Sequence, residues 1–202
     1  MKQRILYTGV LALGLMISTA AFADPSKPNV RQLVTQPVLD DIHAWLTNDI
    51  VAVSVKAQND RLSKLTQPEI DAVDKQWVDE REAADKPLIA ATLSNPLSVY
   101  LNRIQGRSLG LYAEIFIMDQ NGLNVGQSSI TSDFWQGDEA KFLKTFPVGT
   151  AAMFIDEPEW DDDAKIWRAQ VSFTLTDENG NIPIGAATVE LNLTELERRA
   201  SS

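Results

Sequence analysis

The hydrophobic pattern of this 202-residue chain changes its period once, near Gly110, and this change limits the fold more than any other feature. Before Gly110 the apolar residues recur at helical spacing, and after it they alternate along short runs bounded by turn residues. Helices followed by strands, with little mixing of the two, predict an α+β fold with one antiparallel sheet. We therefore expect a helical region over 24–109 and a sheet region over 110–202, both belonging to the same single domain.

The helical region is expected to begin with one long helix. Apolar residues recur from about residue 30 to 65, and Pro37 marks either an early kink or the true start. The stretch from Thr66 to Glu69 has the S/T-x-x-E form of a capping box, which predicts the start of a second helix. Two shorter helical pieces are expected after Pro87 and Pro96.

The sheet region predicts five antiparallel strands. They are expected at 111–118, 123–127, 151–155, 165–176 and 182–191, with a short helix over 138–146. The run 165–176 is the clearest, because it places Val171 and Phe173 on one face and Arg168 and Gln170 on the other. We expect the long helix to cover the apolar face. The polar face either contacts water or lines a cavity roofed by residues 128–146.

The first 23 residues have the layout of a secretory signal peptide. Two basic residues precede an apolar run over 5–17, and Ala21-Phe22-Ala23 supplies the small residues of a cleavage site. The apolar run is short for a bilayer span of about 20 residues. We therefore expect cleavage after Ala23 and an exported, periplasmic mature chain, with an uncleaved membrane anchor as the alternative.

The composition excludes several classes of protein. The chain carries a net charge of −10, and without its first 23 residues it has 16 basic against 28 acidic side chains. Such a chain is repelled by phosphate backbones, so nucleic acid is not expected as a partner. There is no cysteine, and His43 is the one histidine. We therefore expect no cofactor, no usual zinc site and no histidine-based catalytic triad.

One short segment groups acidic and aromatic side chains around Gly137. Trp135 supplies a flat apolar wall with one hydrogen-bond donor, so we consider it as a pocket wall with Asp133 or Asp138 as the polar contact. The same acids are also explained as capping groups at the start of a helix. A catalytic pair of Asp133 and Asp138, as in a small secreted hydrolase, is the least favoured interpretation.

The strand over 165–176 and the acidic run before it supply three further ligand-binding candidates. Arg168 and Gln170 lie on the polar face, where the arginine would pair either with a ligand carboxylate or with an acid of the preceding loop. The acidic run over 156–163 is typical of a solvated loop, and a calcium site is one alternative. In another, Asp161 turns inward toward the pocket.

Two strand-and-turn stretches resemble each other and a known family. Residues 113–122 and 171–180 both end in D-[QE]-N-G, and the second continues into Ile184-Gly185-Ala186. Together with the long helix, they resemble the periplasmic PAS-like sensor domains of the Cache (PDC) superfamily, in the single-module form. The resemblance covers essentially the whole mature chain and is best over 110–192.

The resemblance implies a fold and a class of function. The fold is a five-stranded sheet with a long N-terminal helix across its back, and a small-molecule pocket lies between the free face and the segment after the second strand. The function is a sensor and not an enzyme, and we expect it to signal through a membrane receptor or kinase partner, because no second apolar run of spanning length follows. The long helix is the candidate surface for a homodimer.

The sequence departs from the family's pattern at one point that bears on the ligand. Members that bind amines carry an aromatic pair followed shortly by an arginine, whereas Phe134-Trp135 leads here into Gln136-Gly137. Amino-acid binding is therefore not implied. The alternative to a sensor is a periplasmic adaptor whose pocket is filled by its own side chains.

Overall fold

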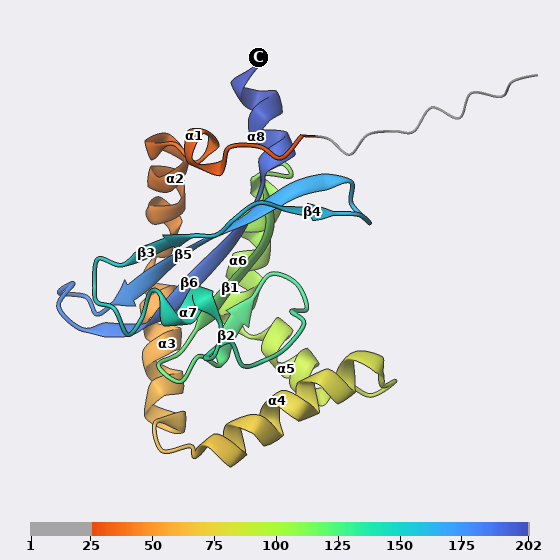
Figure 1. The fold of residues 1–202 in the computed structure, drawn as a ribbon. Helices are drawn as coiled ribbons and strands as arrows, with labels where there is room; N and C mark the ends of the chain where they lie inside the picture. Colours follow the sequence, from red (N-terminus) through yellow and green to blue (C-terminus); the bar gives the residue numbers. More distant parts are fainter. Residues whose placement is uncertain (1–25, 202) are drawn as a thin grey trace, which may run out of the picture.

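The computed structural model describes residues 26–201, so the expected signal peptide lies outside the described residues. Figure 1 shows helices and an antiparallel sheet, which confirms the α+β class. The helices are α1 (Val30–Leu33), α2 (Gln36–Leu46), α3 (Asp49–Leu62), α4 (Gln67–Glu82), α5 (Pro87–Ser94), α6 (Pro96–Arg107), α7 (Ala140–Leu143) and α8 (Leu193–Ala200). The strands are β1 (Tyr112–Met118), β2 (Asn124–Gln127), β3 (Met153–Ile155), β4 (Glu159–Asp161), β5 (Ile166–Thr176) and β6 (Pro183–Asn192).

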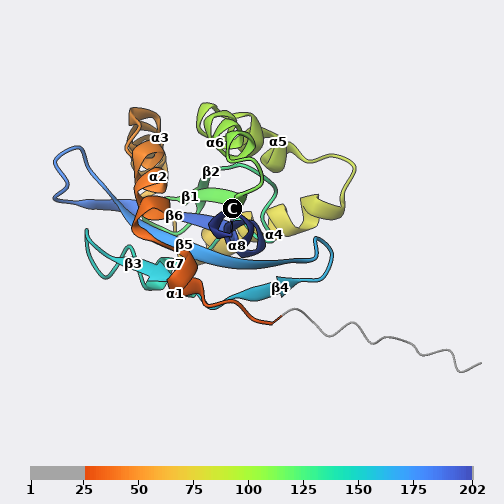
Figure 2. The same ribbon diagram turned by 90° about the horizontal axis from the view of Figure 1, so that it is seen from above.

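The expected long helix is divided into α1, α2 and α3. Pro37 lies in the first turn of α2, where its missing N–H costs nothing, so it marks a helix start and not a kink. The break between α2 and α3 occurs at Thr47 and Asn48, and the Asn48 side chain accepts a hydrogen bond from the N–H of Ile50. Figures 1 and 2 show that α2 and α3 still stack end to end as one column along the sheet. None of the described helices is long and apolar enough to cross a membrane.

The sheet contains six strands, one more than expected. Five of them follow the order β2-β1-β6-β5-β3, and β4 pairs with β5 beside β3. Because β5 has eleven residues and β3 covers only the part from Val171 to Phe173, the remaining edge of β5 is open to β4. Asp161 tightens the following turn by accepting the N–H groups of Asp163 and Ala164, both at 2.9 Å. Part of the predicted acidic loop is therefore a strand.

The two faces of the sheet have different coverings. The inner face packs against α2, α3 and α6, and its core includes Val171, Phe173 and Val189. This confirms the predicted alternation along β5. On the opposite side, which we call the outer face, a smaller apolar cluster joins Phe116 and Met118 to α7. Figure 2 shows α7 below the sheet and the α2–α3 column above it.

Helices α4 and α5 form a third unit at the β2 end of the sheet (Figure 1). The predicted capping box is present, because the Glu69 carboxylate accepts the N–H and the hydroxyl of Thr66. A separate apolar cluster, centred on Trp77 and Phe134, joins these helices to the segment that follows β2. This unit therefore packs on the segment that roofs the outer face.

Candidate ligand-binding site

Three polar side chains form a row across the outer face of the sheet. Glu190 of β6 lies opposite Glu114 of β1 on one side and opposite Gln170 of β5 on the other. Arg168, two residues before Gln170, donates to Glu190 over 2.7 Å between Nη1 and Oε2. The row therefore places two carboxylates on neighbouring strands, an arrangement that is unfavourable for folding because like charges oppose each other.

The segment between β2 and α7 roofs this row. The Ser129 hydroxyl donates to Glu114 over 2.7 Å, and the Lys141 ammonium donates to the amide oxygen of Gln136 over 3.0 Å. Lys141 also pairs with Glu139 at 2.9 Å, and its Nζ lies 5.2 Å from the centroid of the Phe116 ring. The lysine is therefore held by the roof and the floor together.

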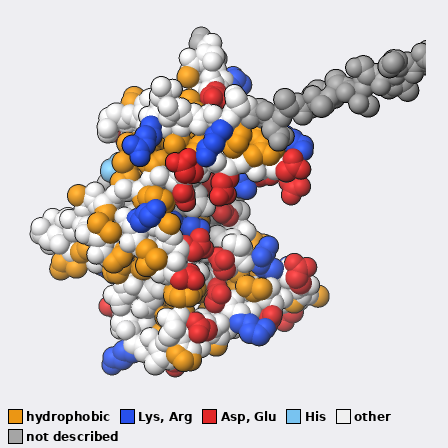
Figure 3. All heavy atoms as spheres, in the orientation of Figure 1, with side chains coloured by type: hydrophobic (Ala, Val, Ile, Leu, Met, Phe, Trp, Pro, Cys, Tyr) orange, Lys and Arg blue, Asp and Glu red, His pale blue; other side chains and the backbone are white. Residues whose placement is uncertain are grey.

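A cavity of about 360 Å³ lies between the row and its roof. A second cavity of about 160 Å³ adjoins it, since Lys141, Arg168, Gln170 and Glu190 line both. The acidic side chains that line the two outnumber the basic ones: Glu114, Glu139, Asp156, Glu157, Glu159 and Glu190 against Lys141 and Arg168. Figure 3 shows acidic side chains gathered along the concave middle of this face. The site is therefore a negatively charged hollow.

Glu114 lies in surroundings that disfavour the charged form of its carboxyl group. Burial raises the pKa of its carboxyl group and the neighbouring Glu190 acts in the same direction, while the hydrogen bond from Ser129 and the charges of Lys141 and Arg168 oppose the rise. Both basic side chains of the cavity are already paired with other acids, Lys141 with Glu139 and Arg168 with Glu190. No salt bridge reaches Glu114 from the described part of the chain. A ligand that brings a positive charge would therefore gain most at Glu114.

The structure brings three of the predicted site residues together. Arg168 and Gln170 line both cavities, as their place on the polar face of β5 predicts. Asp161 does not line either cavity, but its Oδ2 lies 3.2 Å from Nη2 of Arg168. Of the two interpretations of Arg168, the structure shows the ion pair with acids of the protein, and one of these acids belongs to the cavity.

The other three predicted residues do not line either of the two outer-face cavities. The indole of Trp135 does not wall the hollow; it packs against the α4–α5 cluster and donates to the carbonyl of Asn121 over 2.8 Å. Gly137 is required there, because a Cβ on it would lie 2.3 Å from the indole nitrogen. The Asp133 carboxylate accepts from the Gln136 side chain, and Asp138 is exposed. The structure therefore does not bring Asp133 and Asp138 to one cavity.

Sequence reasoning missed most of the lining residues. Glu114 and Glu190 are each the one charged residue of a largely apolar strand, and this was a usable signal that a charge enters the sheet. Ser129 and Gln136 had no such signal, because they lie in an irregular segment whose path is set by tertiary contacts, and Lys141 lies on the short helix α7, whose place over the sheet is set in the same way.

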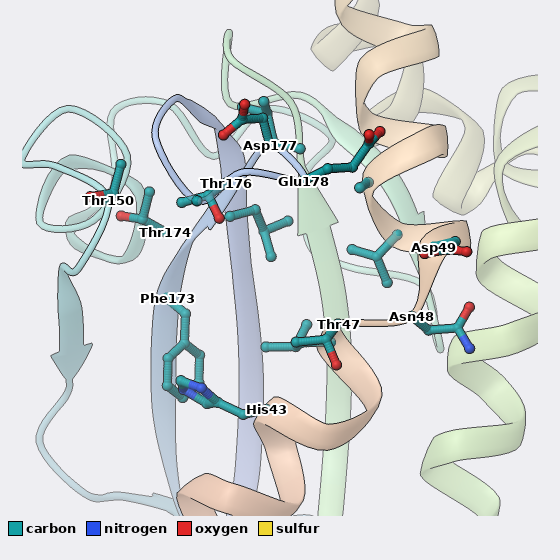
Figure 4. A pocket seen from close by; sticks show the side chains of 16 residues that line it. His43, Thr47, Asn48, Asp49, Thr150, Phe173, Thr174, Thr176, Asp177 and Glu178 are labelled. Atoms are coloured by element: carbon teal, nitrogen blue, oxygen red, sulfur yellow. The ribbon is translucent and has the colours of Figure 1, made fainter.

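A larger cavity, about 490 Å³, lies at the edge of the inner face (Figure 4). It separates the α2–α3 junction from the tip of the β5–β6 hairpin, and the exposed His43 ring lies edge-on to Phe173 with centroids 4.8 Å apart. Its floor is made of core side chains such as Leu46 and Val51. It has no row of buried charges, so we favour the outer-face hollow as the ligand site. Over residues 26–201, no group of three or more acidic or histidine side chains is arranged to hold a metal ion.

No protein-family model matches the chain, and no curated protein matches it in sequence. Solved structures with a similar fold include the ligand-binding domain of the Pseudomonas aeruginosa PAO1 amino acid chemoreceptor PctC, in complex with GABA, at 14% identity and a TM-score of 0.37. The match covers 84% of this chain and 63% of that one. The sensory domain of the Campylobacter jejuni chemoreceptor Tlp3 matches at 14% identity and a TM-score of 0.40, over 83% and 60% of the two chains.

The sensor domain of the Vibrio cholerae histidine kinase DctB matches at 13% identity and a TM-score of 0.34, over 81% of this chain and 59% of that one. The three neighbours are sensor or ligand-binding domains of receptors and a kinase. This chain spans about three fifths of their length. Because all three TM-scores lie below 0.5, we draw nothing about ligand or partner from these superpositions.

Proposed function

We propose that this chain is a periplasmic sensor domain of the single Cache type, which binds a small ammonium compound in the outer-face hollow and passes its state to a partner protein. The observation that carries the proposal is the row of Glu114, Glu190 and Gln170 beneath a polar roof. A protein that places two acids on adjacent strands gives up folding stability there, and an acid with a perturbed pKa in a hollow, as Glu114 is here, is typical of functional sites.

The hollow suits a ligand of about amino-acid size. Its acids would accept hydrogen bonds from an ammonium group, and Gln136 and Gln170 can both donate and accept. Arg168 and Lys141 lie at the same hollow and would accommodate a second, anionic end if the ligand carries one. The ammonium group is the essential part of this proposal, because the lining acids exceed the bases.

Three compounds with four-carbon chains test this ligand class. We expect butylamine and γ-aminobutyrate, which carry an ammonium group, to raise the melting temperature, and butyrate to leave it unchanged. A ligand at a hundredfold excess over its Kd stabilises the folded state by about 2.7 kcal/mol. For a chain of this length, that corresponds to a shift of about 5–10 °C in a thermal melt.

Glu114→Gln is the matched variant for this experiment, since it keeps the shape of the side chain and removes its charge. We expect it to abolish the shift with butylamine. A shift from butyrate alone, or equal shifts in the wild type and in Glu114→Gln, would contradict an ammonium site at this acid.

The raised pKa of Glu114 predicts how binding depends on pH. Ammonium binding requires the ionised carboxylate, so the affinity for butylamine should fall as the pH drops through the raised pKa of Glu114, which lies above its ordinary value of 4.5. Glu190, Lys141 and Arg168 face the same carboxyl group and are present in both proteins compared. Titration calorimetry of the wild type and of Glu114→Gln at several pH values measures the effect, and the variant should lack this step.

The same shift has the opposite sign for folding without ligand. A carboxyl group whose pKa is raised in the folded state contributes its full stability below the unfolded pKa and loses it as the pH rises through the folded pKa. Glu114→Gln should therefore melt above the wild type near neutral pH, with a smaller difference in acid. A variant that is less stable at neutral pH would show that the charge at Glu114 supports the fold.

Export and partner contact belong to the same proposal. The layout of residues 1–23 supports export, and we expect the mature chain to start at Asp24, which mass spectrometry of the secreted protein would measure. We place the receptor, kinase or homodimer contact on the column of α2 and α3, as the family resemblance implies for the long helix, and the exposed Val53 on α3 offers a position for testing it. Sedimentation of the wild type against Val53→Glu tests the homodimer.

One observation favours the adaptor as a second candidate. Phe142 and Phe146 stack with ring centroids 5.3 Å apart and pack on Phe116 and Met118, so side chains of the protein fill the part of the outer face beside the hollow. An adaptor with a closed outer face would respond to none of the three compounds.

A further inference from the structure

One face of helix α4 holds the backbone of the segment over 131–136, which we call the strap. Asp74, Trp77 and Arg81 are spaced by three and then four residues, so they lie along one face of the helix. Each of them makes a side-chain hydrogen bond to the main chain of the strap. Three different side chains of one helix therefore fix one irregular segment.

The contacts follow the strap from end to end. The Trp77 indole donates to the carbonyl of Thr131 and the Arg81 guanidinium to the carbonyl of Ser132, each over 3.0 Å. One carboxylate oxygen of Asp74 accepts the N–H groups of both Phe134 and Trp135 at 2.8 Å. The Trp77 and Phe134 rings stack, with centroids 5.2 Å apart.

The opposite side of the strap faces the outer-face hollow. Thr131, Ser132 and Gln136 line the larger of the two cavities there, and Gln136 also contacts Lys141. The strap therefore lies between α4 and the ligand site. Its path decides where the Gln136 side chain stands above the row of Glu114 and Glu190.

Asp74 has the strongest hold on this path. Its hydrogen bonds to two successive N–H groups involve a charged acceptor, and such bonds are about twice as strong as neutral ones. They end at Trp135, the residue immediately before Gln136. Removing this acceptor leaves two backbone donors of the strap without their partner and loosens the segment just before Gln136, whose own N–H stays bonded to the carbonyl of Gly122.

We propose that Asp74 is a positioning residue of the ligand site, although it does not touch the hollow itself. It fixes the strap so that Gln136 and Thr131 stay above the row of acids. The inference rests on the proposed function, because it assigns a role in binding, but the underlying hold of α4 on the strap can be measured without any ligand.

Two substitutions at Asp74 separate positioning from charge. Asp74→Ala removes the acceptor, and we expect at least about tenfold weaker binding of butylamine, which corresponds to about 1.4 kcal/mol. Asp74→Asn keeps one carbonyl oxygen able to accept both N–H groups, so binding should weaken less than about threefold. Asp79→Ala on the same helix is the matched control, since its carboxylate is exposed and pairs only with Lys75 there, and it should bind like the wild type.

Hydrogen exchange of the strap without ligand measures the hold of α4 on the strap directly. The amides of Phe134 and Trp135 should exchange at least about tenfold faster in Asp74→Ala than in the wild type. In Asp79→Ala their exchange rates should equal those of the wild type. If Asp74→Ala does not fold, Arg81→Ala takes its place, because it alters an exposed side chain on the same face of α4. We expect Arg81→Ala to show faster exchange around Ser132 and about threefold weaker binding of butylamine.

The outcomes distinguish this inference from the proposed function. If the wild type binds neither butylamine nor γ-aminobutyrate, the proposed function fails, and exchange at the strap still decides whether α4 holds it. If the wild type binds but Asp74→Ala binds equally well, the positioning role is overturned. Weaker binding in Asp74→Ala together with rescue in Asp74→Asn supports it.

Discussion

Trp77→Ala is expected to lower the free energy of unfolding by about 3–5 kcal/mol, the range for removing a large aromatic side chain from a core. Trp77 is fully buried, stacks on Phe134 and donates to the carbonyl of Thr131. The substitution leaves a cavity and removes a strap contact that combines packing with a hydrogen bond. Urea unfolding followed by circular dichroism measures the loss, and the strap should also become less protected from exchange.

Two control variants separate the loss of the Trp77 hydrogen bond from the loss of its ring packing. Trp77→Phe keeps a stacked ring and loses the donor, so it should cost about 1–2 kcal/mol. Val78→Ala is on the same helix and 44% exposed, and should change stability by less than about 0.5 kcal/mol. A loss in Trp77→Ala no larger than that in Val78→Ala would mean that the α4 cluster does not contribute to the stability of the fold.

Gly185→Ala is expected to have a comparably large effect on the sheet. A Cβ at this position would lie 2.1 Å from the carbonyl oxygen of Met118 on the neighbouring strand, which is backbone and cannot rotate away. The β1–β6 pairing would have to open locally, so we expect a loss of about 3 kcal/mol or more, at the upper end of overpacking effects. Equilibrium unfolding in urea measures it, or loss of soluble protein if the sheet does not form.

Gly106→Ala makes the same chemical change where space is open. No heavy atom lies within 4 Å of the added Cβ, and Gly106 is in the last turn of α6. Because alanine favours a helix more than glycine does, stability should rise by about 0.5–1 kcal/mol. If Gly185→Ala proved as harmless as Gly106→Ala, the close approach of β6 to β1 would not constrain this residue. This approach also gives a physical reason for the glycine in Ile184-Gly185-Ala186.

Local patterns predicted the elements of the fold well. The period-two alternation of β5, the capping box at Thr66 and the turn at Gly122 are decided by contacts within a few residues, so they could be predicted from the sequence. The break at Asn48 was missed although Asn48 is a good N-cap, because the apolar spacing continues across it. Strand β4 was missed because its three residues belong to the acidic run and have no strand pattern of their own. They form a strand by pairing with the free edge of β5.

The candidate site shows where sequence reasoning ends. The sequence by itself determined the α+β class, the polar side of β5 and hence Arg168 and Gln170, since side-chain direction along a strand follows from its geometry. Only the tertiary structure decided that Glu114 and Glu190 lie opposite each other and that Trp135 turns toward α4. Strand register and the path of the strap depend on contacts between residues 50 or more positions apart, as for Asp74 and Phe134, and no local pattern records them.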